Sequence, residues 1–240
     1  MFELILNSTN ELNNNLIHKY NINLYHCSEV IFIIPFSDFL LINIFGKRAR
    51  WFQLHSLINI LITYLIVEDI SNFILKPLSS IKLIEDLRPI YYIVYLHTYH
   101  FFIKTLYFIE LVHHILFVFM GVLPCIFFWK NNLINLWVFS GCGLPGAIDY
   151  FILSLVKKNI LLSSKQKYIS SIINNYFRLP ISIYGLTITY TAYMEDIIEA
   201  EIYFLYYICI LIYFNGTFFN KLAIESYIKY KYTNKIDYNI

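Results

Sequence analysis

The residues best suited to chemistry in this chain are an acidic residue and two adjacent histidines in the segment ELVHH, residues 110–114. They interrupt a long stretch that is otherwise nearly all apolar. Ionisable groups at membrane depth are costly and mark functional sites. On a helix, Glu110 lies three and four positions before His113 and His114, so its carboxylate can reach either imidazole. This spacing favours a general base or a nucleophile held by an acid.

Two polar stripes lie in neighbouring apolar segments. The first consists of His55, Asn59 and Thr63, and the second of His97, His100 and Lys104. Spacings of three, four, seven and eight residues place the members of each stripe on one face of a helix. We expect both faces to point into a helix bundle, where they either line a cavity or bond to a neighbouring helix.

A third group of polar residues lies further along the chain. Asp149 follows the sequence Gly143-Leu144-Pro145-Gly146, and Asn215 lies in the last apolar stretch. The proline either opens a site or simply kinks the helix and frees a carbonyl. The catalytic candidates are therefore His113, His114 and Asp149, with His55, Asn59, His97, His100, Glu110 and Asn215 as supporting residues around a polar cavity with apolar walls.

Composition decides what positions these residues. The chain is 58% hydrophobic and only 14% charged, whereas about a quarter of the residues of a soluble domain are charged. A water-soluble fold cannot hide this much apolar surface. The sequence therefore predicts an all-α, polytopic membrane protein in which Tyr and Phe supply packing and interfacial belts.

Apolar runs of about 20 residues, long enough to span the hydrocarbon, occur about seven times. They cover residues 29–46, 51–69, 89–107, 109–129, 133–156, 179–194 and 202–222. The interval 88–128 is too long for one span, so the chain must turn near Glu110 or in the short segment before it. We expect a polar segment at 1–28, a first transmembrane helix at 29–46, the main membrane domain at 47–230 and a short tail at 231–240.

Charged residues predict the orientation. One set of connections carries Lys47, Arg48, Arg50, Lys157, Lys158, Lys165, Lys167, Arg178, Lys229, Lys231 and Lys235, and the other carries Glu195, Asp196, Glu199 and Glu201. By the positive-inside rule the basic set and the C-terminus are cytosolic and the N-terminus is lumenal. The abundance of Ile, Asn, Lys and Tyr is typical of AT-rich genomes such as those of intracellular parasites or large viruses. The expected location is the endoplasmic reticulum or a host-derived membrane.

Several functions have no support in the sequence. The net charge of +2 is spread over loops, with no basic stripe that would follow nucleic acid. The cysteines are far apart and lack the CxxC spacing of zinc or redox sites. Phosphate-cradling and serine-hydrolase motifs are absent from the sequence, and no metal or tightly bound cofactor is expected.

Four segments in order resemble the signatures of the TLC domain. They are WFQLH at 51–55 with Asn59 and Asp69, LHTYH at 96–100, ELVHH at 110–114 and GLPGAIDY at 143–150. The family is named for the translocating-chain-associating membrane protein, the longevity-assurance ceramide synthases and a neuronal ceroid lipofuscinosis protein. The resemblance covers residues 45–230 and implies a six-helix barrel around a central cavity, with one extra helix before it.

In ceramide synthases, the histidine pair matched by His113 and His114 is required to move an acyl group from coenzyme A onto a sphingoid amine. A further signature of those enzymes has a His-Asp followed by another Asp, and only the latter has a match, Asp149. A Gly-Leu-Pro-Gly segment stands in place of the His-Asp. In this departure the chain resembles the uncharacterised TLC proteins of protists and viruses.

Three functions remain open. The first is lipid handling, in which the cavity binds, senses or modifies membrane lipids. The second is an acyltransferase that uses fatty acyl-CoA and a sphingoid base, with His113 or His114 as base or acyl-accepting nucleophile, oriented by Glu110 or Asp149. The third is a di-iron membrane oxygenase, disfavoured because the chain has only seven histidines and none after His114. The sequence leaves the oligomeric state open.

Overall fold

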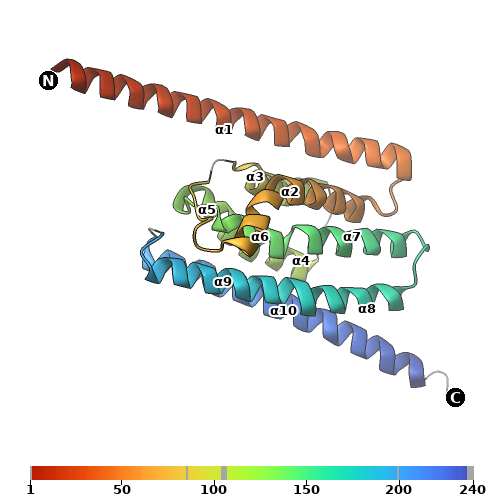
Figure 1. Cartoon of the computed structure of the whole chain (residues 1–240). Helices are drawn as coiled ribbons and strands as arrows, with labels where there is room; N and C mark the ends of the chain where they lie inside the picture. The colour runs from red at the N-terminus through yellow and green to blue at the C-terminus, as the bar shows by residue number, and fades with distance from the viewer. Residues whose placement is uncertain (1, 85, 104–106, 199, 237–240) are drawn as a thin grey trace.

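The chain folds into a bundle of helices, as Figure 1 shows for the computed structural model. The structure describes residues 2–84, 86–103, 107–198 and 200–236. Within these ranges the regular structure is helical, and strand-like pairing is limited to one bridge between Leu83 and Asn131. The predicted all-α class is therefore confirmed.

Ten α-helices and two π-helical segments make up the described chain. They are α1 (Phe2–Phe45), α2 (Arg50–Leu75), α3 (Arg88–Ile103), α4 (Phe108–His113), η1 (His114–Val122), α5 (Leu123–Phe128), α6 (Leu133–Gly141), α7 (Leu144–Lys157), α8 (Ser163–Ile173), η2 (Asn174–Arg178), α9 (Leu179–Met194) and α10 (Ile202–Ile236). The elements α4, η1 and α5 follow one another without interruption, as do α8, η2 and α9.

Five helical stretches among the described residues are long and apolar enough to cross a membrane. They are Leu24–Phe45, Arg50–Leu75, Phe108–Phe128, Leu133–Lys157 and Ile202–Thr233. The other two predicted spans fall on α3, which has 16 residues, and on α9, which continues the helix of α8 and η2; both are helical, but neither is among the five. Membrane-spanning helices in general need about 20 residues. The helices are thus those of a multi-pass membrane protein.

The structure bears on three expected boundaries. The polar segment at 1–28 is helical from Phe2 onward and continuous with the first span. The division expected near Glu110 or in the short segment before it lies in that segment, between the end of α3 at Ile103 and the start of α4 at Phe108. The prediction of a long basic connection before Leu179 is wrong, because the chain is helical again from Ser163.

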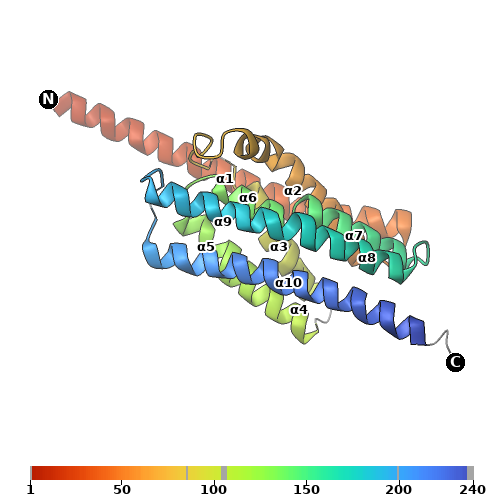
Figure 2. The same cartoon turned by 60° about the horizontal axis from the view of Figure 1, so that its bottom comes forward.

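The helices contact one another in a consistent order. Helix α1 packs against α2 and α3, and α2 also packs against α3, α6 and α7. From α3 the contacts continue to η1, from η1 to α10, from α10 to α8 and α9, and from these to α7 and α6. Figure 2 shows the same helices lying side by side, with α10 beside α4 and α8. One face of α2 packs inside the bundle, where its Ile58, Ile62 and Ile66 are fully buried.

Two of the expected basic connections lie at one end of the bundle. The Arg48 guanidinium donates a hydrogen bond to Asn159 Oδ1 at 3.1 Å, which joins the α1–α2 turn to the α7–α8 turn. Beside it, the Lys158 ammonium lies 4.5 Å from the Phe45 ring centroid. We call this the basic end. Glu195 and Asp196 follow α9 at the opposite end, where α9 and α10 are joined (Figure 1).

Candidate functional site

Five histidines from three segments of the chain meet inside the bundle near the basic end. His55 comes from α2, His97 and His100 from α3, and His113 and His114 from α4 and η1. Their ring centroids form a connected set, 5.6 Å apart for His55 and His97, 5.3 Å for His55 and His100, 4.7 Å for His97 and His114, and 5.9 Å for His97 and His113. Four of the five are buried and His113 is half-buried. We call this group the histidine cluster.

Main-chain carbonyls fix the tautomer of three of these rings. Nδ1 lies 2.8 Å from Trp51 O in His55, 2.7 Å from Ile93 O in His97 and 2.6 Å from Glu110 O in His114. A carbonyl oxygen only accepts, so Nδ1 carries the proton in each case. When such a ring is neutral, its Nε2 is therefore the hydrogen-bond acceptor.

The two adjacent histidines have different surroundings. His114 donates to Glu110 O through Nδ1, and its Nε2 lies 3.3 Å from His100 Nδ1. His113 makes no hydrogen bond to a described residue, and its ring packs between Phe117 and Phe219 at centroid distances of 5.4 and 5.1 Å. His114 is therefore held in place by polar contacts, whereas His113 is held by aromatic packing with its nitrogens available.

Aromatic residues enclose the histidine cluster on the α2 side. The Trp51 ring stacks on His100 with centroids 4.3 Å apart, and Tyr150 lies 4.7 Å from His55. Trp51 is in turn covered by the Arg50 guanidinium at 5.2 Å. Arg50 pairs with the buried Asp38 of α1, which also accepts a hydrogen bond from Tyr99 at 2.8 Å. Sequence reasoning missed Asp38, although a lone carboxylate in an apolar run is the same signal that revealed Glu110.

The acidic candidates lie at the edge of the cluster. The Glu110 carboxylate accepts the Tyr107 N–H at 3.0 Å and so caps the start of α4, while its main-chain carbonyl orients His114. Asp149 is half-buried in α7, and its Oδ1 has no hydrogen-bond partner among the described residues. Its neighbour Tyr150 is the residue of that segment that contacts a histidine.

The remaining candidates are placed as follows. Asn59 is buried one turn beyond His55, and Thr63 bonds to its carbonyl. Asn215 Nδ2 lies 3.7 Å from the position that a Cβ would take at Gly141, which puts Asn215 beside the junction of α6 and α7. Lys104, the third member of the α3 stripe, lies outside the described residues.

Arg178 is an interior residue that the sequence assigned to a cytosolic connection. Its Nε donates to Ser140 O at 3.1 Å and its Nη1 to Asn174 Oδ1 at 2.8 Å. Ser140 is in the last turn of α6, where carbonyls lack partners within the helix. The Gly143–Pro145 break thus frees a carbonyl, and an arginine from another helix occupies it.

Each of the two π-helical segments includes one of the site residues described above, His114 or Arg178. η1 begins at His114 and η2 ends at Arg178. Each segment is followed two residues later by a proline, Pro124 or Pro180. Because proline has no N–H to donate, it interrupts the regular hydrogen-bond ladder and favours local widening of the helix. Such π segments occur frequently at functional sites.

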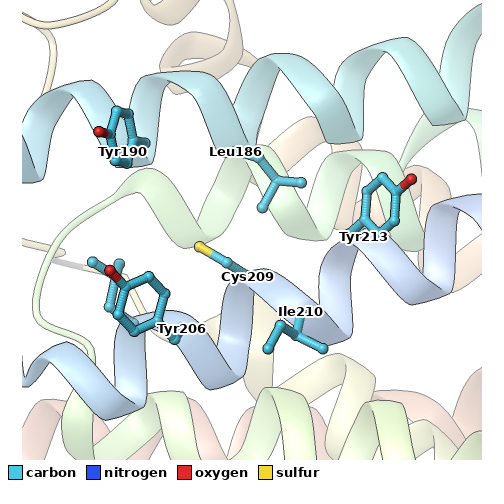
Figure 3. Close-up of a pocket in the computed structure, with 7 residues that line it drawn as sticks. Leu186, Tyr190, Tyr206, Cys209, Ile210 and Tyr213 are labelled. Carbon is cyan, nitrogen blue, oxygen red and sulfur yellow. The ribbon is translucent and has the colours of Figure 1, made fainter.

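Among the described residues, no member of the histidine cluster lines either of two pockets. One, of about 330 Å³, is an apolar groove between α9 and α10 lined by residues such as Tyr190, Cys209 and Tyr213 (Figure 3). The other, of about 130 Å³, lies at the opposite end from the histidines. There Asp69 accepts hydrogen bonds from Asn132 and Asn135 at 2.9 and 2.7 Å.

The geometry of the cluster bears on metal binding. Metal ions need nitrogen ligands at about 2.0–2.1 Å converging on one point. Among the residues that the structure describes, no group of three His, Cys, Asp or Glu side chains is arranged to hold a metal ion. The four cysteines are free thiols. The arrangement instead suits proton exchange between imidazoles and a reacting group.

Comparisons with protein-family models, with curated proteins and with solved structures find no match for this chain.

Proposed function

We propose that this chain is a multi-pass membrane protein of the TLC type that handles or modifies membrane lipids at the histidine cluster. The observation that carries the proposal is the meeting of five imidazoles inside the bundle. Polar groups at membrane depth are costly, and a single hydrogen-bonded pair would suffice to join two helices. Five rings exceed what helix association requires.

His113 is the reactive residue in this proposal. It is the half-buried member of the cluster, its Nδ1 makes no hydrogen bond to a described residue, and Phe117 and Phe219 provide an apolar wall for a lipid chain. His114, bonded at both ring nitrogens, positions the α4–η1 segment against His100. The other sequence candidates are Asp149, in α7, and Asn215, beside the junction of α6 and α7.

The barrel and its seven spans belong to the same proposal. The order of helix contacts, from α2 through α3, η1, α10 and α9 back to α6 and α7, supports a six-helix barrel with α1 outside it. In the proposed topology the basic end is cytosolic, the N-terminus is lumenal, and the protein resides in the endoplasmic reticulum or a host-derived membrane.

A second candidate function is an N-acyltransferase that uses fatty acyl-CoA and a sphingoid base. It is favoured by the nearness of His113 to the basic end, since α4 begins only five residues before it. In this reaction the amine attacks the thioester carbonyl, His113 takes the amine proton, and the C–S bond breaks. The proton then passes to the leaving thiolate, so that the products are an amide and free coenzyme A.

The test compares the lipids of cells that express the parent chain, a His113→Ala/His114→Ala variant, or a His26→Ala control. His26 lies on α1, outside the cluster, with Nδ1 4.0 Å from Asp86. We expect the parent and the control to change the lipid composition of the cells. The double variant, present at the same abundance, should not produce this change. For the acyltransferase, membranes supplied with acyl-CoA and a sphingoid base should form N-acyl product, falling about 100-fold or more in the double variant. An unchanged lipid profile in all three would contradict the histidine mechanism.

A further inference from the structure

Two hydrogen-bond donors from different helices approach one spot on α7. Gly146 is buried, and a Cβ built there would lie 2.8 Å from Asn59 Nδ2 and 3.7 Å from Arg178 Nη2. The missing side chain at Gly146 therefore leaves room for the Asn59 amide of α2, and the Arg178 guanidinium of η2 lies at ordinary contact distance from the same position. Any side chain at this position would push into the amide.

Neither donor group is fully used within the protein. The Asn59 side chain is 4% exposed and makes no hydrogen bond to a described residue. Arg178 donates through Nε and Nη1, while Nη2 has no acceptor among the described residues. No described carboxylate forms an ion pair with Arg178. Buried polar groups without partners cost free energy, so a ligand that accepts hydrogen bonds from this pair would offset that cost.

The depth of this spot makes an unpaired cation especially costly. Asn59 is nine residues along α2 from Arg50 at the basic end, which corresponds to about 14 Å of helix. The hydrocarbon core is about 30 Å thick, so Asn59 and Arg178 lie near its centre. A charged side chain there costs roughly 2.5–3.5 kcal/mol or more, and an anionic ligand would offset that cost.

We propose that Asn59 Nδ2 and Arg178 Nη2, which both approach Gly146, together bind the small anionic headgroup of a lipid. The guanidinium fork matches the paired oxygens of a carboxylate or a phosphate, and the amide adds a third donor. His55 precedes Asn59 by one helical turn, so the bound headgroup lies next to the histidine cluster. This inference rests on the proposed function in taking the ligand to be a lipid, and it names the class of lipid.

The test measures binding to the purified full chain in phosphatidylcholine nanodiscs. The probes are oleate, oleyl phosphate and oleyl alcohol, which share one chain and differ in the headgroup. We expect at least one of the two anions to bind about tenfold more tightly than the alcohol, since charge-assisted hydrogen bonds are the strong ones. The tighter anion identifies the source as a carboxylate or a phosphate.

Matched variants locate the site. Arg178→Gln should weaken binding of the preferred anion about tenfold, and Lys221→Gln, which removes an exposed cation of α10, should not change it. Asn59→Leu and Gly146→Ala keep the arginine and should each weaken binding several-fold, so they decide the question if Arg178→Gln does not fold. Anion binding that is unchanged in these variants, or no tighter than alcohol binding, would overturn the proposal.

The same assay separates this proposal from the proposed function. The His113→Ala/His114→Ala variant should still bind the anion, because its donors are elsewhere. Anion binding without any histidine-dependent lipid change would contradict only the lipid-modifying role of the histidines. A histidine-dependent lipid change with no anion binding would contradict only the Asn59–Arg178 site.

Discussion

At the scale of single residues, the adjacent histidines show how one step along a helix separates two roles. Successive side chains on a helix point about 100° apart. His114 turns toward α3, where it meets His100 and the Glu110 carbonyl, and His113 turns toward Phe219 of α10. The first is positioned by hydrogen bonds, and the second is left with unused nitrogens.

This difference predicts different effects of substitution. His114→Leu should lower the free energy of unfolding by about 2 kcal/mol, because it removes two hydrogen-bond contacts and leaves the Glu110 carbonyl without this donor. His113→Leu keeps the aromatic packing and breaks no hydrogen bond, so it should change stability by less than about 1 kcal/mol. Chemical denaturation of both variants in mixed micelles measures this. Equal destabilisation would contradict the assigned roles.

At the scale of elements, α1 is attached to the bundle by polar clusters as well as by apolar contacts. The buried Asp38 pairs with Arg50 of α2 and Tyr99 of α3. Toward the other end of the bundle, the Arg88 guanidinium of α3 lies 3.7 Å from the Glu29 carboxylate of α1 and donates to Asp86 at 2.7 Å. Because Arg50 also covers Trp51, which stacks on His100, the attachment of α1 is connected to the histidine cluster.

We therefore predict that Asp38→Ala destabilises the protein by about 3 kcal/mol, since it leaves the partly buried Arg50 without its counter-ion. Glu225→Ala is the matched control. It breaks the exposed pair between Lys221 and Glu225 on α10, and such pairs contribute little. Thermal unfolding in detergent should show a clear decrease for the first variant and none for the second. A similar midpoint for both would mean that the Asp38 pair does not hold α1.

At the scale of the whole molecule, the charged turns divide between the two ends of the bundle. The α1–α2 and α7–α8 turns meet through Arg48 and Asn159, and Glu195 lies at the other end. In the proposed topology, the basic end is cytosolic by the positive-inside rule. The expected orientation puts the histidine cluster in the cytosolic half, within reach of water-soluble co-substrates.

Labelling of single cysteines tests this orientation. In a chain with Cys27, Cys125, Cys142 and Cys209 replaced by serine, Lys165→Cys should react with an impermeant reagent from the cytosolic side. Glu195→Cys should react only from the other side, because α9 separates the two exposed positions. Asn159→Cys serves as the control and should behave like Lys165→Cys. Labelling of Lys165→Cys and Glu195→Cys from one side would refute the topology.

Features that depend on local composition and helical period can be predicted from the sequence of this chain. Apolar runs predicted helices at every expected span, because burial in hydrocarbon requires that backbone groups bond within their own segment. Helical period predicted that His55 and Asn59 share a face, and likewise His97 and His100, and all four are buried. These predictions needed no knowledge of which helix lies beside which.

Which of these faces meet depends on the packing of the helices. Arg178 follows several lysines in the sequence, a pattern that predicts a basic connection, yet η2 carries it against the end of α6. Asp38 likewise has its partners on other helices, α2 and α3. The different surroundings of His113 and His114 also come from other helices. The physical reason is that the rotation and register of each helix are set by packing against its neighbours. That packing is a property of pairs of segments distant in the chain, and hydropathy or periodicity within one segment does not contain it.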